Sequence, residues 1–443
     1  DTDADGDLSD EPPVLLHDDA RNGDAVADDN VYSVNGINMA DGAIFTIAAQ
    51  IVAPGGVSEG LRIWAKADAG TNTTTDNDIV STWKNYGLGG ELAALADGFY
   101  DNPESPTFVA QGSNFNPAIA LKQYAGMAQL NMFKEHDLSG PGASTFFKIK
   151  AIAGEAINPG YNSLGNIGEA TLSATTSPFG SRGVYVSSAT SAGLYHYNAE
   201  LNSTNLLDPS TDNIISFLYT TGISASYPFY VNGKSIPATY NPPHSGNNFH
   251  INTDADGGPD SGPYEYQEVI SYEQQLSDAD RIKVETYLAV KYGVTMDNSA
   301  GGVAGDYLSV NGTIIWDADA NAVNYHHDVA GIGRDDAEAL GQIKSKSQNA
   351  DAVLTITAED EGSNDANAFV DINDETYLLW GNNDGVNTWN EVDAPTGYTK
   401  IARTWIAKET GETGDLTLEF DFNNAQFNIS QNALFEEFFL LVD

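Results

Sequence analysis

Two acidic stretches have the residue types and the spacing that suit a divalent cation. Residues 1–11, DTDADGDLSDE, place Asp at every second position from 1 to 7 and Gly at position 6. Ca²⁺ takes about six to eight oxygen ligands, alternate carboxylates can surround one ion, and Gly6 permits a sharp turn. We therefore predict Ca²⁺ as a cofactor. The first predicted set of ligands comprises Asp1, Asp3, Asp5, Asp7 and Asp10.

This first stretch does not fit the EF-hand loop in full. Pro12 stands where that loop has a bidentate Glu, Glu11 comes one residue early, and no helical pattern follows. The stretch resembles more closely the short calcium repeats of thrombospondin type 3 or of bacterial surface linkers. A disordered acidic linker is the alternative interpretation.

A second acidic loop, NTDADGGPD, occupies residues 252–260 and repeats the same pattern of oxygen ligands. Its predicted ligands are Asn252, Asp254, Asp256 and Asp260. The GGPD tail departs from the EF-hand spacing, so a polar hairpin loop stays the alternative interpretation.

The sequence also contains residue types that occur in zinc sites and in glycosidase sites. His326, His327 and Asp328 are residue types that bind zinc. Neighbouring residues on a strand point to opposite faces, so a polar turn is the favoured interpretation unless the segment is a loop. A glycosidase needs two acids at a set separation across a cleft, and among 63 acidic residues no pair can be chosen by spacing. We therefore predict no catalytic residues.

Aromatic side chains are the remaining candidates for ligand binding. Trp83 and Tyr86, together with Tyr195 and Tyr197, could present flat rings to a sugar. For Trp83 the alternative is a place in the hydrophobic core.

Composition restricts the partners. The formal net charge is −44, which repels nucleic acid and anionic membranes and attracts divalent cations. No apolar run reaches the roughly 18–20 residues of a membrane span, so no membrane insertion is predicted. The absence of cysteine excludes disulfides and is typical of bacterial exoproteins. The chain lacks an initiator Met and ends in a strand-like run, so we expect a piece of a longer polypeptide.

Short β-rich runs bounded by Gly, Asn, Pro or Ser predict an all-β protein with a two-sheet sandwich. The Asn232-Gly233 pair between apolar neighbours predicts a hairpin turn. The stretch Glu268–Gly293 predicts a strand followed by a short helix, with Ser277 as its N-cap and Gly293 just beyond its end. No residue of this stretch suggests catalysis.

Four landmarks of the sequence resemble bacterial laminin-G-like (concanavalin A-like) jelly-roll domains. They are Gly60–Gly70, Val80–Gly90, the pair Pro106–Val109 and Asn114–Ile119, and Glu268–Gly293. The second landmark departs from the family at Asn85, Tyr86 and Gly87. A later run, DVAGIGRDD followed by QIKSKS, resembles the β-sandwich module that often accompanies these domains in large bacterial surface proteins.

The resemblance implies the following organisation. Residues 1–11 form an acidic calcium linker, 12–56 a connector or β arm, 57–297 a jelly roll that ends in the capped helix, and 303–443 a second β-sandwich module that is truncated at its C-terminal end. From this we predict a non-catalytic, calcium-stabilised adhesion or binding module at the bacterial cell surface or outside the cell. Its predicted partners are glycans or neighbouring surface proteins.

Two other classes of function stay open. One is a structural subunit of a surface filament or layer that self-assembles through β contacts, with residues 12–56 as a donor strand. The other is a carbohydrate-active enzyme, because one fold hosts many functions.

Overall fold

The computed structural model describes most of the chain after residue 50. The described residues are 17–18, 32–33, 45–46, 51–88, 92–94, 105–122, 127–129, 142–155, 162–168, 182–188, 191–196, 199–204, 211–220, 229–236, 248–252, 262–299, 301–302, 305–319, 324–358, 364, 372–386, 389–390, 394–421 and 438–442. The chain divides by packing into two compact units, Asp1–Ile51 and Val52–Asp443. In the first unit, β1 (His17–Asp18) pairs with β2 (Tyr32–Ser33).

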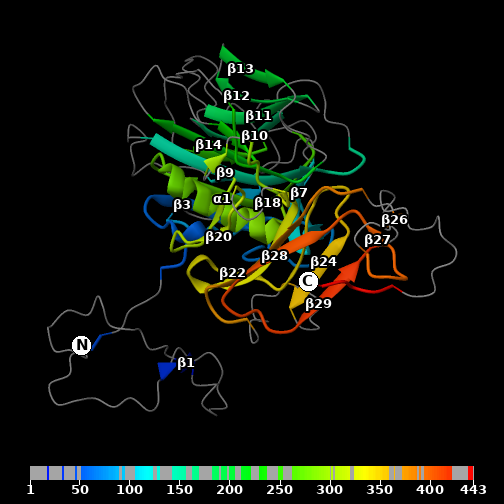
Figure 1. Cartoon of the computed structure of the whole chain (residues 1–443). Helices are drawn as coiled ribbons and strands as arrows, with labels where there is room; N and C mark the ends of the chain where they lie inside the picture. The colour runs from blue at the N-terminus through cyan, green and yellow to red at the C-terminus, as the bar shows by residue number, and fades with distance from the viewer. Residues whose placement is uncertain are drawn as a thin grey trace, which may run out of the picture. The chain divides into compact units, whose positions relative to one another are not determined.

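The second unit begins with a sandwich of two eight-stranded antiparallel sheets (Figure 1). One sheet has the order β13 (Ala199–Thr204), β12 (Ser191–His196), β11 (Arg182–Ser188), β10 (Asn162–Gly168), β17 (Asn248–Ile251), β8 (Met127–Gln129), β5 (Leu92–Ala94) and β4 (Thr82–Trp83). The other has the order β16 (Lys234–Ile236), β15 (Phe229–Val231), β14 (Asn213–Thr220), β9 (Gly142–Ala151), β18 (Tyr264–Tyr272), β7 (Asn116–Leu121) and β6 (Thr107–Ser113), and β3 (Leu61–Lys66) also pairs with β18.

A single core cluster joins the two sheets. Trp83 and Leu92 of one sheet pack with Phe147, Ile215 and Tyr266 of the other, and all five side chains are buried. The sheet that contains β3 and β18 is buried on both faces, because Val269 of β18 packs in this cluster while its neighbour Ile270 packs in the cluster around the helix α1 (Asp278–Tyr292).

A second, smaller set of strands follows. One sheet has the order β22 (Leu340–Gln342), β21 (His327–Asp335), β25 (Thr376–Asn382) and β28 (Trp405–Thr410), and another the order β23 (Lys344–Lys346), β24 (Leu354–Ala358) and β29 (Leu416–Phe420). Two short antiparallel pairs complete the set, β19 (Tyr307–Leu308) with β20 (Ile314–Trp316), and β26 (Trp389–Asn390) with β27 (Lys400–Ile401). Ile332, Ile356 and Trp380 belong to its core cluster, so these sheets also pack face to face. The predicted all-β sandwich architecture is confirmed.

The helix α1 (Asp278–Tyr292) is capped as the sequence predicts. Ser277 accepts a hydrogen bond from the backbone N–H of Asp280, and Gly293 adopts the left-handed conformation (φ 64°) that a residue without Cβ tolerates best. The Asn232-Gly233 turn is confirmed as well, because both residues have positive φ and Val231 pairs with Lys234. In the described part of the chain, no helix is long and apolar enough to cross a membrane.

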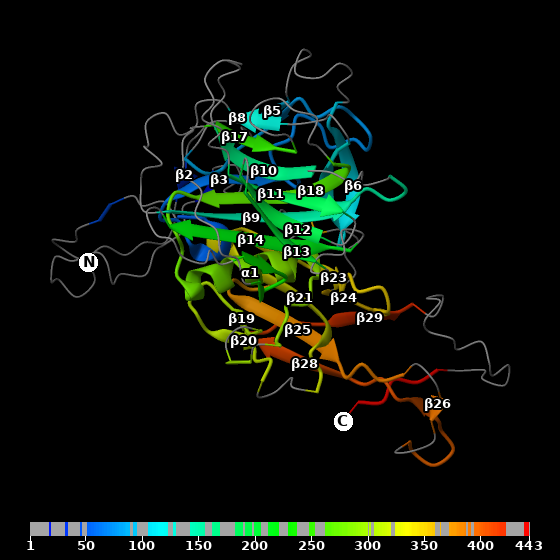
Figure 2. The ribbon, with the colours of Figure 1, turned by 90° about the horizontal axis from the view of Figure 1, so that it is seen from above.

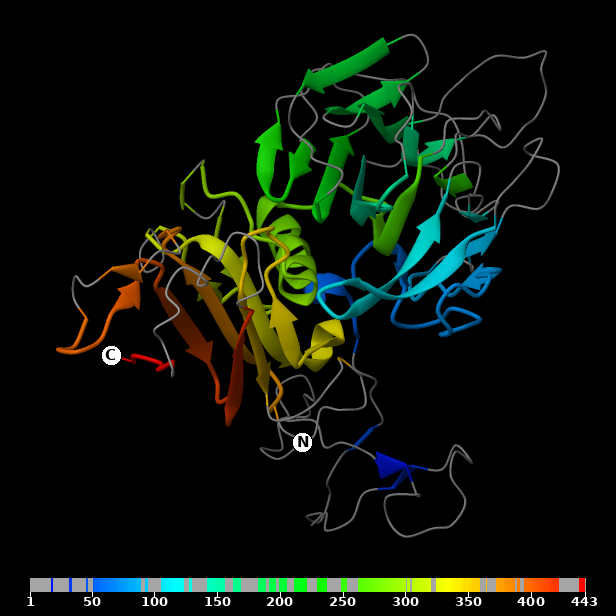
Figure 3. The ribbon, with the colours of Figure 1, turned by 90° about the vertical axis from the view of Figure 1, so that its right-hand side faces the viewer.

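The sequence predicts that α1 closes the first sandwich, and in the structure α1 also packs against the second. Figures 2 and 3 show the helix between the strands of the first sandwich and those of the second. One core cluster unites Tyr287 and Leu288 of α1 with Phe146 of β9, Trp316 of β20 and Leu379 of β25. The two sets of sheets therefore share a hydrophobic core through one helix, whereas the predicted boundary of 297/303 separates them in sequence.

Candidate functional site

Most of the predicted calcium ligands lie outside the described residues. These are Asp1, Asp3, Asp5, Asp7, Asp10, Asp254, Asp256 and Asp260. Asn252 is described and fully buried. Its amide donates to the carbonyl oxygens of Leu121 and Lys122 at 3.3 Å each, and its side-chain oxygen accepts from the N–H of Gly262 at 3.0 Å. Asn252 thus joins the two ends of the loop that carries the other three predicted ligands.

Trp83 and Tyr86 occupy different environments. The Trp83 side chain is fully buried, and its indole N–H donates to the carbonyl oxygen of Lys66 at 2.9 Å. It therefore offers no exposed ring, and the core alternative describes its position. Tyr86 is 39% exposed, but the ammonium groups of Lys84 and Lys66 lie 4.6 Å and 5.4 Å from its ring centroid. Burial, followed by the charge of Asp68, raises the pKa of Tyr86.

The two adjacent histidines point to different groups, as expected for neighbours at the start of a strand. The Nε2 atom of His326 lies 2.6 Å from the carbonyl oxygen of Met296, and its Nδ1 accepts from the indole N–H of Trp316 at 3.1 Å. His327 instead faces the carboxylates of Asp328 and Asp351. The two imidazoles therefore cannot share an ion.

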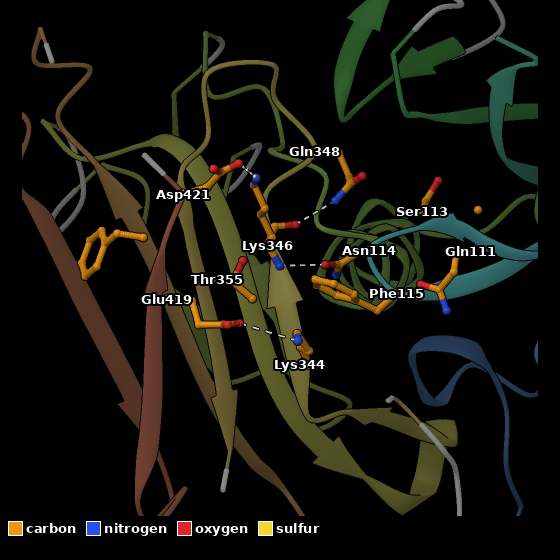
Figure 4. A pocket seen from close by; sticks show the side chains of 12 residues that line it. Gln111, Ser113, Asn114, Phe115, Lys344, Lys346, Gln348, Thr355, Glu419 and Asp421 are labelled. Atoms are coloured by element: carbon orange, nitrogen blue, oxygen red, sulfur yellow. Dashed lines mark hydrogen bonds and ion pairs between the residues drawn. The ribbon is translucent and has the colours of Figure 1, made fainter. Parts of the chain in front are cut away.

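A groove of about 510 Å³ lies between the two sandwiches. One wall is the end of the β6–β7 hairpin. The opposite wall is the sheet of β23, β24 and β29 (Figure 4). The lining residues are Gln111, Gly112, Ser113, Asn114, Phe115, Lys344, Lys346, Gln348, Thr355, Glu419, Phe420 and Asp421.

The hairpin wall is built by a two-residue turn. Ser113 pairs with Asn116, and Asn114 and Phe115 between them have φ values of 48° and 63°. Positive φ at both central residues defines the turn type that best matches the twist of a two-residue hairpin. Asn accepts this backbone conformation better than most residues do, and the turn places the Phe115 side chain at the groove.

Asn114 fixes the hairpin to the second sandwich. Its side-chain amide donates to the carbonyl oxygen of Lys291 at 3.0 Å and to Ser345 Oγ at 2.9 Å, and its Oδ1 accepts from the backbone N–H of Lys346 at 2.7 Å. Its own carbonyl oxygen accepts from the Gln342 amide at 3.1 Å. One buried side chain thus contacts the end of α1 and strand β23, so the width of the groove is set by direct hydrogen bonds.

The sheet wall carries alternating charges. Lys344 and Lys346 are two residues apart on β23 and therefore share a face of the sheet. Lys346 pairs in register with Thr355, which pairs in turn with Glu419. The Nζ of Lys344 lies 3.6 Å from Glu419 Oε2, and that of Lys346 lies 3.9 Å from Asp421 Oδ2.

An aromatic ring faces this charged wall. The Lys344 ammonium group lies 4.9 Å from the centroid of the Phe115 ring. Figure 4 shows Phe115 and Gln111 on the hairpin side, opposite Lys344, Lys346 and Glu419. The groove therefore combines one ring, amide groups and charges of both signs.

The carboxylates of the groove do not form a glycosidase arrangement. Glu419 and Asp421 have side chains that are 61% and 47% exposed, and each lies within 4 Å of a lysine. A glycosidase holds one acid in apolar surroundings so that it keeps its proton for the leaving group. Neither of these two residues has such surroundings.

The sequence alone does not indicate the groove. Its two walls include residues of Asn114–Ile119 and of QIKSKS, which in the sequence are only landmarks of a resemblance. The alternating lysines of Lys344-Ser345-Lys346 do predict two cations on one face of a strand. The partner wall is more than 200 residues away in sequence, and no local pattern indicates it.

Comparisons with known proteins give a limited result. Residues 280–443, which begin inside α1, match the family described as "Domain of unknown function (DUF8202)". No curated protein matches the chain.

Solved structures that are similar to the chain include Trypanosoma rangeli sialidase in complex with sialic acid, with 11% identity, a TM-score of 0.32, and coverage of 52% of this chain and 33% of that chain. Another is a GH54 α-L-arabinofuranosidase mutant, with 10% identity, a TM-score of 0.35, and coverage of 47% and 50%. A third is the binding domain of Paraclostridial Mosquitocidal Protein 1, with 9% identity, a TM-score of 0.35, and coverage of 52% of each chain. The chain thus spans between a third and about half of the length of these proteins, and what they share with it is all-β architecture.

These comparisons correct the predicted function. Sialidases and an arabinofuranosidase, which are glycoside hydrolases, are among the similar structures beside a binding domain. The prediction of a non-catalytic adhesion or binding module is therefore wrong as a statement of function, and the structural-subunit alternative that accompanied it is withdrawn.

Proposed function

We propose that the groove between the β6–β7 hairpin and the β23–β24–β29 sheet binds a saccharide. The observation that carries this proposal is the polarity of the groove, because nine of its twelve lining residues have polar side chains.

A saccharide presents many hydroxyl groups that both donate and accept hydrogen bonds. The groove offers both functions, since the amides of Gln111 and Gln348 donate and accept, the lysines donate, and Glu419 and Asp421 accept. Pockets for drug-like ligands are mostly apolar, so this lining disfavours an apolar ligand. The cavity of 510 Å³ also lies within the range of about 300–1,000 Å³ that is usual for small-molecule sites.

Phe115 supplies the apolar surface that the C–H face of a sugar ring needs. Lys344 lies over this ring, and its flexible stem allows the ammonium group to move towards a ligand while it stays near Glu419. The ring comes from one sandwich and the lysine from the other, so the site exists only where the two meet.

We also propose that the resemblance of residues 57–297 to laminin-G-like jelly rolls reflects common descent, and that the protein acts outside the cell. The four ordered landmarks support the first proposal. The absence of cysteine in 443 residues supports the second.

Binding to a panel of neutral, uronic-acid and sialylated oligosaccharides tests the proposal, with an array first and calorimetry on the strongest binders. We expect Lys344→Ala to weaken binding by about tenfold or more, because a hydrogen bond to a charged group contributes about 1.5–3 kcal/mol. Gln111→Ala should weaken it by roughly three- to tenfold, because a neutral hydrogen bond contributes about half of that. Lys408→Ala is the matched control, since Lys408 is exposed on β28 and does not line the groove. Absence of binding to the whole panel, or wild-type binding by both Lys344→Ala and Gln111→Ala, would contradict the proposal.

A further inference from the structure

One imidazole and three carboxylates converge at a second place in the smaller sandwich. His327 and Asp328 lie at the start of β21, Asp351 lies between β23 and β24, and Asp384 follows β25. We propose that these four side chains bind one divalent transition-metal ion, with Zn²⁺ as the test case.

The distances favour a shared ion over hydrogen bonds. The Nε2 atom of His327 lies 3.2 Å from Asp328 Oδ1, 3.3 Å from Asp351 Oδ2 and 3.5 Å from Asp384 Oδ1. A charge-assisted N–H···O bond is shorter, at about 2.7–2.9 Å, and Nε2 carries at most one proton for three acceptors. Tetrahedral zinc with bonds of about 2.0–2.2 Å separates neighbouring ligand atoms by roughly 3.3–3.6 Å. The contacts around His327, at 3.2, 3.3 and 3.5 Å, are closer to this second spacing than to that of a charge-assisted hydrogen bond.

The net charge of the cluster is negative, which also favours the binding of a cation. Arg403 is the cation that reaches it among the described lysines and arginines, at 3.3 Å from Asp328 Oδ2 and 2.7 Å from Asp351 Oδ2. One guanidinium against three carboxylates leaves two negative charges, which a divalent ion would neutralise.

The carboxylate of Asp328 is held in place by two side-chain amides. The amide of Asn349 donates to Asp328 Oδ1 at 2.9 Å, and that of Asn382 donates to Oδ2 at 2.6 Å. Metal sites characteristically orient their ligands through such outer contacts. The imidazole distinguishes this place from the acidic stretches, because Ca²⁺ prefers oxygen ligands whereas zinc accepts nitrogen.

The sequence indicates zinc at His326, His327 and Asp328 only as a weak possibility, because adjacent histidines on a strand diverge. The structure removes His326 from the cluster and brings Asp351 and Asp384 in its place. The ligand set is therefore assembled from three separate segments.

Calorimetric titration of the tag-free full chain with Zn²⁺ tests the proposal, after chelation and in excess Ca²⁺ to saturate the acidic stretches. We expect one Zn²⁺ per chain in the wild type and in the control Asp415→Asn, which changes an exposed Asp elsewhere in the same sandwich. In His327→Gln and Asp384→Asn the dissociation constant should rise by at least about tenfold. Equal affinity and stoichiometry in all four proteins would overturn the proposal.

Asp384→Asn is the decisive variant, because the Asp384 side chain is 70% exposed and we therefore expect its replacement to leave the fold intact. X-ray absorption at the zinc edge identifies the atoms that bind zinc in the wild-type protein directly, without a variant. We expect one imidazole nitrogen with carboxylate oxygens at about 2.0–2.2 Å. A zinc shell without imidazole would refute the site.

Discussion

Lys291, in the last turn of α1, donates a hydrogen bond of 3.0 Å to Glu268 Oε2 on β18. The same carboxylate group accepts from the indole N–H of Trp64 and from the hydroxyls of Tyr287 and Tyr292. Both charged residues are buried. Burial acts to lower the pKa of Lys291, but the carboxylates of Asp68 and Glu268 together hold it well above its usual value. This pair fixes the helix on the first sandwich and thereby fixes the surface that it presents to the second.

Replacement of Glu268 by Ala should destabilise the fold by about 3–5 kcal/mol, because it leaves the ammonium group of Lys291 buried with one carboxylate partner fewer. Urea denaturation followed by circular dichroism measures the loss. Glu59→Ala is the control, since Glu59 is exposed, and it should change stability by no more than about 0.5 kcal/mol. Similar losses in both variants would show that the pair is not what holds the helix.

Stability should depend on pH through Glu338, which is buried beside Asp335. Burial is the largest cause that raises the pKa of Glu338 well above its usual value, and the charge of Asp335 adds to it. The Tyr377 hydroxyl donates to Asp335 at 2.6 Å and also lies 3.4 Å from Glu338. The folded protein therefore keeps the Glu338 proton to a higher pH than the unfolded chain does, so stability falls as the pH rises above about 4.3.

Glu338→Gln should remove this dependence. A neutral amide imitates the protonated acid, so we expect the variant to be more stable than the wild type at pH 8 and nearly equal to it at pH 4. Melting temperatures across this range measure the difference, with the exposed Glu412→Gln as a matched control. A difference between Glu338→Gln and wild type that does not change with pH would contradict the assignment.

The side chain of Asn114 should control both stability and the groove. Asn114→Gly keeps the left-handed backbone and removes the side-chain hydrogen bonds, so we expect a loss of about 1–3 kcal/mol. Asn114→Ala should cost more, because Ala tolerates positive φ less well than Gly. Denaturation measures both variants, and a more stable Asn114→Gly would show that the hairpin is not held through this residue.

The features that the sequence predicts are those set by neighbours in the chain. Ser277, Asp280 and Gly293 define the helix ends through local hydrogen bonds and backbone conformation, and Asn232-Gly233 defines its turn for the same reason. Alternation along the strands is likewise local, so the all-β class follows from it.

The contacts of α1 with both sandwiches are made between residues that are far apart in the sequence. Tyr287 and Leu288 are apolar residues at helical spacing whatever they pack against, so their contacts with Trp316 and Leu379 cannot be derived from the pattern. The candidate sites depend on the same kind of contact. Asn114 meets Lys346 across 232 residues, and His327 meets Asp351 across 24.

Saccharide binding in the groove should depend on salt when the ligand is acidic. The ammonium groups of Lys344 and Lys346 lie 3.6 Å and 3.9 Å from their carboxylate partners, which is longer than a charge-assisted hydrogen bond and leaves both free to turn towards an anionic sugar. We expect affinity for uronic-acid or sialylated oligosaccharides to fall several-fold between 50 and about 500 mM NaCl, because salt screens partly exposed charges. Affinity for neutral oligosaccharides should not change. Calorimetry at several salt concentrations measures both, and an equal response of the two ligand classes would argue against a role of the lysines.

Calcium binding stays a prediction of the sequence, and its two stretches can be tested separately. Residues 1–11 belong to the compact unit Asp1–Ile51, whereas the loop 252–260 belongs to Val52–Asp443 and begins at the buried Asn252. Ca²⁺ in the second loop should raise the melting temperature of the larger unit. The expected gain in the free energy of unfolding is about 2.7 kcal/mol when the Ca²⁺ concentration is one hundred times the dissociation constant. The double variant Asp254→Asn/Asp256→Asn should abolish this rise, and Asp3→Asn/Asp5→Asn should leave it intact, because its residues belong to the other unit. Differential scanning calorimetry with Ca²⁺ and with EDTA distinguishes the two, and a melting temperature that chelation does not alter in the wild type would refute calcium stabilisation of the larger unit.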